Sequence, residues 1–154
     1  MISKNISYKE AVNSKTALRL GINNIPNAEQ LNSMQNVAER VFQPIREHFN
    51  VPIYISSFFR SEALNKAIGG SKTSQHCKGE AMDLDADIFG GITNAQIFNY
   101  IKDNLEFDQL IWEFGTDKNP SWVHVSYSQY QSRHTILKAI KNNGKTIYQN
   151  YVGI

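Results

Sequence analysis

The segment SQHCKGEAMDLD, residues 74–85, places a histidine and an aspartate seven positions apart. Imidazole nitrogens and carboxylate oxygens are both ligands of divalent metal ions, so His76 and Asp83 are candidate ligands of one metal. A solvated surface loop would account for the same residues. This spacing is much less diagnostic than paired Cys-x2-Cys motifs. The interpretation therefore depends on what the rest of the chain places beside these two side chains.

Three short segments are typical of β-strands: AMDLDA (81–86), FDQLIWEFG (107–115) and SWVHVSY (121–127). The polar turn TDKNP separates the last two, and strands this close in sequence usually pair as an antiparallel hairpin. Successive side chains of a strand point to opposite faces of the sheet. One face is then expected to pack through Met82, Leu84, Leu110, Trp112, Phe114, Val123 and Val125.

The opposite face of these strands would carry the polar chemistry. It would hold Asp83, Glu113 and His124, and His76 would come from the loop ahead of the first strand. Two imidazoles and one carboxylate form a common catalytic zinc set, which leaves a fourth position for water or substrate. His76, Asp83 and His124 are therefore the predicted metal ligands.

The remaining predicted elements must support this face. Residues 27–49 show helical periodicity, and Pro44 is expected to kink or interrupt the last turns of that helix. VPIYISS (51–57) suggests a short strand. A second helix should start near Ser61 and stop at Gly69 and Gly70, and a third should run from Thr93, its N-cap, to Asn104.

Length and composition indicate an ordinary globular chain. Its 154 residues are 41% hydrophobic and 19% charged, and no repeat or linker divides them, so we expect a single domain. A formal net charge of +2 is too small to suggest a nucleic-acid partner. Cys77, the only cysteine, excludes an intrachain disulfide. The N-terminus lacks signal-peptide features, and no window approaches the ~20 apolar residues of a membrane span, so we expect a soluble chain without membrane insertion. We also expect a monomer.

A family resemblance adds to this interpretation. The segment SSFFRSEALNKAIGGSKTSQHCKGEAMDLD, followed by WVHVSY, resembles the zinc D-Ala-D-Ala carboxypeptidase and L-alanyl-D-glutamate peptidase family of peptidoglycan hydrolases. The family motif Ser-x-His-x-x-Gly-x-Ala-x-Asp is matched by Ser74, His76, Gly79, Ala81 and Asp83. His124, in WVHVS, matches the final zinc histidine of the family. The resemblance covers roughly residues 7–128 and leaves residues 129–154 unassigned.

The resemblance implies both a fold and a function. The fold is a small α+β domain with a mostly antiparallel sheet and helices packed on one face, as in the signalling domain of hedgehog proteins. The function is that of a zinc metallopeptidase that hydrolyses an amide bond in peptidoglycan stem peptides. His76, Asp83 and His124 would bind Zn²⁺, and Arg60, in SFFR, would hold a substrate carbonyl or carboxylate. An ordinary surface or helix-capping role for Arg60 stays open.

The catalytic base is where the chain departs from the family pattern. Many relatives carry an acid three positions before the last histidine, but Ser121 occupies that position and cannot shuttle a proton near neutral pH. Glu113 is the best candidate, although it could be a solvated strand carboxylate, and Asp117 in the turn is the runner-up. Asp85 is either a partner of the metal ligands or a solvated acid. Ser74 and Gln75 could contact peptide or orient His76.

The other conspicuous residues favour ordinary roles. We expect Cys77 to be a partly buried free thiol, His48 to lie at a helix C-terminus, and His134 to be exposed or packed. Trp112 and Trp122 are expected in the core or on a cleft wall.

The choice between an enzyme and a binding module stays open at this point. A non-catalytic, zinc-containing cell-wall-binding or structural module is the alternative to the enzyme, and the cleaved bond is open between carboxypeptidase and endopeptidase types. The location is open too. A phage endolysin, which degrades the cell wall after a second protein opens the membrane, is favoured by family analogy alone.

Overall fold

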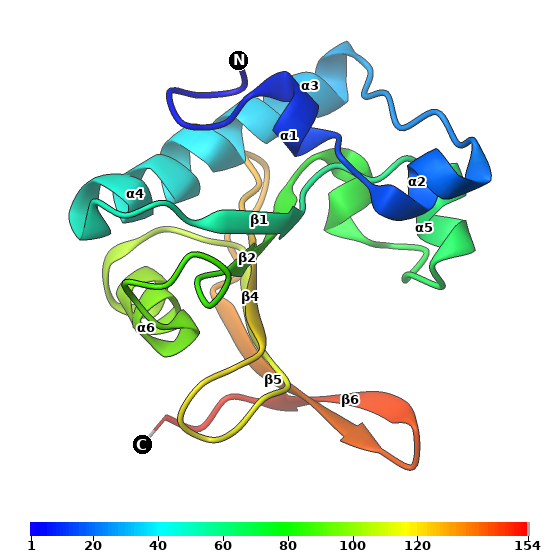
Figure 1. The fold of residues 1–154 in the computed structure, drawn as a ribbon. Helices are drawn as coiled ribbons and strands as arrows, with labels where there is room; N and C mark the ends of the chain where they lie inside the picture. Colours follow the sequence, from blue (N-terminus) through cyan, green and yellow to red (C-terminus); the bar gives the residue numbers. More distant parts are fainter. Residues whose placement is uncertain (154) are drawn as a thin grey trace.

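The computed structural model describes residues 1–153, and within them the strands form one six-stranded sheet (Figure 1). Its order is β1-β2-β4-β3-β5-β6, and every neighbouring pair is antiparallel except β3 and β5. The strands are β1 (Tyr54–Ser57), β2 (Ala81–Asp85), β3 (Gln109–Glu113), β4 (Trp122–Ser126), β5 (Thr135–Asn142) and β6 (Lys145–Asn150). The expected α+β class with a mostly antiparallel sheet is confirmed.

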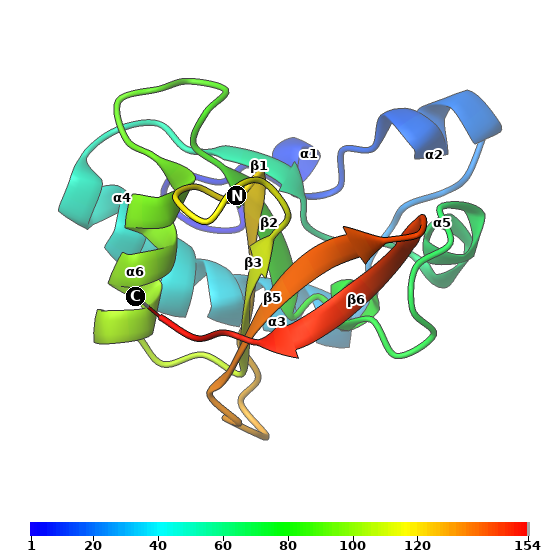
Figure 2. The same ribbon diagram turned by 90° about the horizontal axis from the view of Figure 1, so that it is seen from below.

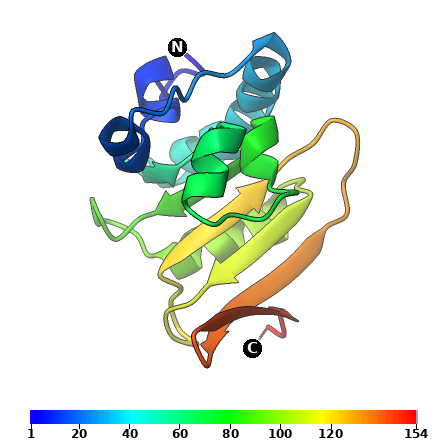
Figure 3. The same cartoon turned by 90° about the vertical axis from the view of Figure 1, so that its right-hand side faces the viewer.

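Most of the helices cover one face of this sheet, and the helix that follows β1 lies on the other. The helices are α1 (Tyr8–Ala11), α2 (Lys15–Leu20), α3 (Ala28–Val37), the π-helix η1 (Ala38–Phe42), α4 (Gln43–Phe49), α5 (Glu62–Ala67), the 3₁₀-helix η2 (Gln75–Lys78) and α6 (Asn94–Asn104). Figure 3 looks onto the opposite face, with α6 behind the sheet and α5 in front. The buried core between the sheet and the α3-to-α4 and α6 helices includes Met34, Val41, Phe42, Met82, Leu84, Phe98, Ile101, Leu110 and Val123.

The long predicted helix is interrupted, and the interruption lies ahead of Pro44. Residues 28–49 are helical throughout, but the turn at η1 is wide, because the Gln43 N–H bonds to the Ala38 carbonyl, five residues back. Pro44 then sits in the first turn of α4, where its missing N–H costs little. The widened turn therefore replaces the kink expected in the last turns.

The other predicted helix starts agree with the structure. The Ser61 side chain caps α5, and Thr93 caps α6 in a reciprocal capping box with Gln96. Each helix begins at the residue after its cap. These caps fix where α5 and α6 begin.

The central strands have the predicted pairing and faces. β3 and β4 form the expected antiparallel hairpin, and Asp83 of β2 lies directly opposite His124 of β4. Phe114 is the exception, because it was expected to share the core face with Leu110 and Trp112. The strand ends at Glu113, and Phe114 has a φ of 56°, so its ring turns to the open face and packs against Trp122 with ring centroids 5.3 Å apart.

Gly79 is required by a close approach between η2 and α3. Its φ is 74°, and a Cβ there would lie 2.4 Å from the carbonyl oxygen of Gln30. The Gln30 side chain donates a hydrogen bond of 3.0 Å to the Cys77 carbonyl across the same contact. The glycine lets the turn that carries His76 pack directly against the helix.

The C-terminal segment, which the sequence left unassigned, extends the sheet. β5 pairs in parallel with β3, with Glu113 opposite Ala139, and β6 returns antiparallel to β5. Asn143 and Gly144 connect the two strands with φ values of 51° and 76°. Positive φ at both central residues is the signature of a tight two-residue hairpin turn, for which Asn-Gly is the preferred sequence.

No helix among residues 1–153 combines the length and apolar character needed to cross a membrane.

Candidate active site

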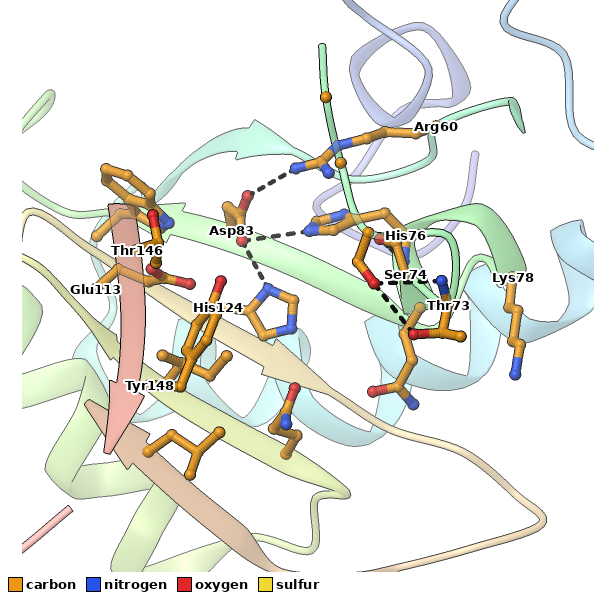
Figure 4. Close-up of a pocket in the computed structure, with 18 of the residues that line it drawn as sticks. Arg60, Thr73, Ser74, His76, Lys78, Asp83, Glu113, His124, Thr146 and Tyr148 are labelled. Atoms are coloured by element: carbon orange, nitrogen blue, oxygen red, sulfur yellow. Dashed lines mark hydrogen bonds and ion pairs between the residues drawn. The ribbon is translucent and has the colours of Figure 1, made fainter. Parts of the chain in front are cut away.

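Three side chains from separate elements converge on the open face of the sheet (Figure 4). Asp83 on β2 and His124 on β4 are register partners, and Asp83 Oδ1 lies 3.0 Å from His124 Nδ1. His76 extends from η2, and its Nε2 lies 3.4 Å from the same carboxylate oxygen. One ligand atom from each residue lies within 4.8 Å of the others, so the cluster could hold a metal ion. The structure thus brings together the three predicted ligands.

The hydrogen bonding of His76 shows that these residues fit a metal. Its Nδ1 lies 2.7 Å from the carbonyl oxygen of Phe58, which can only accept, so Nδ1 carries the proton. Nε2 is buried and has no hydrogen-bond partner among residues 1–153. Burial also lowers the pKa of His76, against the raising effect of Asp83, and so favours neutral imidazole. The free lone pair of Nε2 therefore faces a carboxylate oxygen, an arrangement that a cation between the two would stabilise.

Asp83 is held as a carboxylate. Burial by itself raises its pKa, but the interactions of the carboxylate with the imidazoles of His76 and His124 outweigh this effect and leave the pKa well below its usual range. Its second oxygen, Oδ2, lies 3.4 Å from Nη2 of Arg60. The carboxylate is consequently available to a metal at any pH near neutrality.

Arg60 lies at the edge of the cluster, where the family resemblance placed it. Its Nε donates to Ser57 Oγ at 3.1 Å, and Nη1 lies 3.5 Å from Asn65 Oδ1. These bonds hold the guanidinium beside Asp83 while part of it faces the cleft. The position suits a donor to a substrate oxygen near the metal ligands.

Glu113 and Asp117, the two candidate bases, have very different environments. Glu113 is 7% exposed and faces the cleft from β3. Burial raises its pKa to about 7, with His124 and Arg60 opposing the shift and Asp83 adding to it. Asp117 is exposed, does not line the cleft, and forms an ion pair with Lys138, which lowers its pKa. The structure places Glu113 at the cluster and Asp117 outside it.

The residues around the motif hold η2 in place. The Ser74 side chain accepts a hydrogen bond of 3.3 Å from the His76 N–H. Gln75 lines the cleft and donates from Nε2 to Asp108 Oδ2 at 2.9 Å. Asp108 is buried and also receives two hydrogen bonds from the Arg133 guanidinium, at 2.9 and 2.8 Å. Ser74 therefore caps the turn that carries His76, and Gln75 ties the motif to a buried carboxylate.

Several other candidates lie apart from the cluster. Asp85 accepts hydrogen bonds from the Asn94 side chain and the Asp87 N–H, and it does not line the cleft. Ser121 is exposed, and its N–H bonds to the Glu113 carbonyl, so the serine that replaces the family acid helps to close the β3–β4 hairpin.

The remaining predictions for single residues agree with their positions. Cys77 is a partly buried free thiol outside the metal cluster. His48 lies in the last turn of α4 and stacks on Tyr100, and His134 pairs with Glu106. Trp112 packs in the core, while Trp122 lines the cleft.

The cluster opens into a cleft of about 780 Å³. One side is formed by Arg60 and the segment from Gly69 to Lys78, and the floor by β2, β3 and β4. The far side comes from the C-terminal hairpin, through Leu137, Lys141, Thr146 and Tyr148. Sequence reasoning missed these last residues, although the Asn143–Gly144 pair between β-prone runs was a hairpin signal.

A His-Asp-His cluster beside a carboxylate with a pKa of about 7 and an arginine, in an open cleft, is suited to metal-assisted hydrolysis. A family model described as Peptidase M15 matches residues 4–126. The chain therefore belongs to the M15 peptidase family, which confirms the resemblance drawn from its motifs. A search of curated proteins found no match to the chain.

Proposed function

We propose that this M15 peptidase is zinc-dependent and hydrolyses an amide bond in peptidoglycan stem peptides, and so acts in cell-wall degradation. The observation that carries the proposal is the buried, unpartnered Nε2 of His76 facing Asp83 beside His124. Two imidazoles and a carboxylate match the ligand set of catalytic zinc sites better than the all-oxygen sets of calcium or magnesium.

His76, Asp83 and His124 would hold the metal, and the surrounding residues would act on the peptide. When bound, zinc would lower the pKa of a coordinated water and polarise the scissile carbonyl. Glu113, with a pKa of about 7, is suited to take a proton from water and to deliver it to the leaving amine. The Arg60 guanidinium would donate to the carbonyl oxygen as negative charge develops on it.

The substrate is proposed from the family and from the shape of the cleft. The floor of the cleft is a sheet face along which an extended peptide can lie. Both family bond types, D-Ala-D-Ala and L-Ala-D-Glu, remain candidates within this proposal. A phage lytic setting and a monomeric state are part of it as well, and they rest on family analogy.

The proposal is tested by metal content and product analysis together. The purified protein should contain or take up one zinc per chain by elemental analysis, and a muropeptide digest should release a new amine that mass spectrometry assigns to one bond. Asp83→Asn should lose zinc and activity together, whereas Glu113→Gln should lose activity and keep zinc. Failure to take up zinc would overturn the metal site.

A second outcome separates the enzyme from a binding module. Protein that holds one zinc and binds stem peptides, but releases no amine from any of them, would be a non-catalytic cell-wall module. Ser121, in place of the family acid, is the feature that makes this outcome worth testing. The position of Glu113 at the cluster favours catalysis over it.

A further inference from the structure

The far wall of the cleft lies outside the part of the chain that the family model matches. The match ends at residue 126, and the wall is formed by β5 and β6, residues 135–150. The hairpin projects to the same side of the sheet as α5 (Figures 1 and 2). It therefore faces the segment from Gly69 to Lys78 across the cleft. Side chains at this wall therefore line the cleft but are not part of the family motifs.

The register of the sheet places Tyr148 in line with the candidate base. Glu113 lies opposite Ala139, and Ala139 lies opposite Tyr148, so all three point to the same face. In Figure 4 the Tyr148 side chain extends toward Glu113 and His124. Its hydroxyl has no hydrogen-bond partner among residues 1–153, and the residue is 55% exposed. Burial and the negative charges of Glu113 and Asp83 raise the pKa of Tyr148, so the phenol keeps its proton and can donate.

Lys141 is two positions after Ala139 on β5, so its side chain lies on the same face of the hairpin as that of Tyr148. Its partner across the hairpin is Thr146, whose Oγ1 accepts a hydrogen bond of 3.0 Å from Lys141 Nζ. The ammonium group also lies 5.4 Å from the centre of the Phe114 ring. No carboxylate among residues 1–153 pairs with it, whereas Arg133, the nearby cation of the same cleft, is neutralised by Asp108. Lys141 is thus a cation held in place by neutral neighbours at the edge of the cleft.

The spacing of these two residues defines what the wall could bind. Tyr148 and Lys141 lie diagonally across the hairpin, two positions apart in register, so they are about 7–8 Å apart, which is close to the span of two residues of an extended peptide. We propose that the β5–β6 hairpin is a substrate-binding wall for an acidic peptide, in which Lys141 binds a carboxylate and Tyr148 donates a hydrogen bond to the reacting carbonyl oxygen. The carboxylate would lie within one or two residues of the scissile bond. This inference rests on the proposed peptidase function and names the substrate feature that the cleft recognises.

Stem peptides offer this chemistry in two places, the free α-carboxylate of a γ-linked glutamate and the C-terminal carboxylate. Binding is measured by calorimetry on the zinc-loaded Glu113→Gln protein, with a synthetic stem pentapeptide and with two analogues, each amidated at one carboxylate. The free acid should bind more tightly than one of the two amides. Adding Lys141→Gln should weaken binding of the free acid about three- to tenfold and abolish that preference. Lys145→Gln, the same charge change on the opposite face of the hairpin, should retain it.

The Tyr148 contact is tested by kinetics. Tyr148→Phe should lower kcat about tenfold or more with little change in KM and unchanged zinc content, because the lost hydrogen bond strengthens only as charge develops on the oxygen. Tyr130→Phe, at an exposed tyrosine outside the cleft, should match the wild type.

The outcomes separate this inference from the proposed function. A wild-type enzyme that cleaves stem peptides, with Lys141→Gln keeping the acid-over-amide preference and Tyr148→Phe keeping full kcat, would overturn the binding wall and leave the peptidase intact. A wild-type protein that cleaves no stem peptide would overturn the proposed peptidase function. The effect of Lys141→Gln on the preference for the free acid over the amide would still decide whether the wall binds a carboxylate.

Discussion

The Nδ1 of His76 donates to the carbonyl oxygen of Phe58 at 2.7 Å, and this bond determines what the other ring nitrogen can do. It fixes the tautomer and the ring orientation, so the lone pair of Nε2 is aimed at the space shared with Asp83 and His124. Phe58 lies two residues before Arg60, and the Arg60 N–H in turn bonds to the His76 carbonyl at 3.2 Å. The segment that presents the arginine therefore also sets the first ligand.

Metal removal should lower stability, because a metal that binds only the folded chain stabilises it by mass action. At a free zinc concentration of about 100 times Kd this amounts to roughly 2.7 kcal/mol, or about 5–10 °C in Tm for a chain of this size. Thermal unfolding with and without a chelator measures it. Asp83→Asn should show no response to zinc, and an unchanged response would remove Asp83 from the ligand set.

Glu113→Gln should lower kcat by about 10²–10⁴-fold, because the amide cannot accept the proton that general-base catalysis requires. Steady-state assays on a stem peptide measure this, and elemental analysis should show zinc retained. Asp117→Asn is the matched control, because Asp117 lies in solvent and pairs with Lys138. Near-normal turnover of Glu113→Gln would exclude Glu113 as the base.

Activity should rise with pH through the titration of Glu113, because only its carboxylate can accept a proton. Without a bound cation the pKa of Glu113 is about 7. A bound cation would favour the carboxylate and lower this pKa, so activity should reach half of its maximum at or below pH 7. The pH profile of kcat/KM reports it. If the residual kcat/KM of Glu113→Gln rises with pH in the same way as that of the wild type, the titrating group is not Glu113.

Gly79→Ala should destabilise the fold by more than the ~1–2 kcal/mol that a left-handed backbone costs an alanine, because its Cβ would meet the Gln30 carbonyl at 2.4 Å. Gly90→Ala is the matched control, since Gly90 has nearly the same φ, 75°, and nothing within 4 Å of an added Cβ. Urea unfolding of the two variants measures the difference. Equal losses would show that the contact with α3 costs nothing.

Asp108→Asn should destabilise the protein by about 1–3 kcal/mol, because it removes the buried charge that Arg133 and Gln75 contact. Glu106→Gln, at an exposed carboxylate that pairs with His134, should leave stability nearly unchanged. Chemical denaturation measures both. A loss for Asp108→Asn no larger than that of the control would indicate that the buried network adds little.

The parts of the fold governed by local rules could be predicted from the sequence. The sequence predicts Thr93 as a helix cap and a helix start near Ser61, because a side-chain oxygen that accepts a backbone N–H is a local feature. The β3–β4 hairpin followed from two β-prone runs and a short turn, and alternation then placed Glu113 and His124 on one face. The three candidate ligands followed from this geometry and the family motif together.

The features that were missed depend on backbone detail or on contacts distant in sequence. The reversal of Phe114 comes from a left-handed φ at the strand end, which alternation cannot anticipate. The widened turn at Ala38–Phe42 arose one turn before the proline that was expected to break the helix. The parallel pairing of β5 with β3 joins strands separated by β4, and neither strand contains a signal for the other. Tyr148 and Lys141 were missed with it.

The parallel pairing between β3 and β5 also bears on how the chain can be shortened. A fragment that stopped at residue 126 would uncover the backbone N–H and C=O groups of Gln109–Glu113 along a full strand edge. Exposed edges of this kind template pairing with other chains and promote aggregation. The strand that bears Glu113 would then become an exposed edge that can pair with other chains. A minimal catalytic fragment of this protein therefore has to include the C-terminal hairpin.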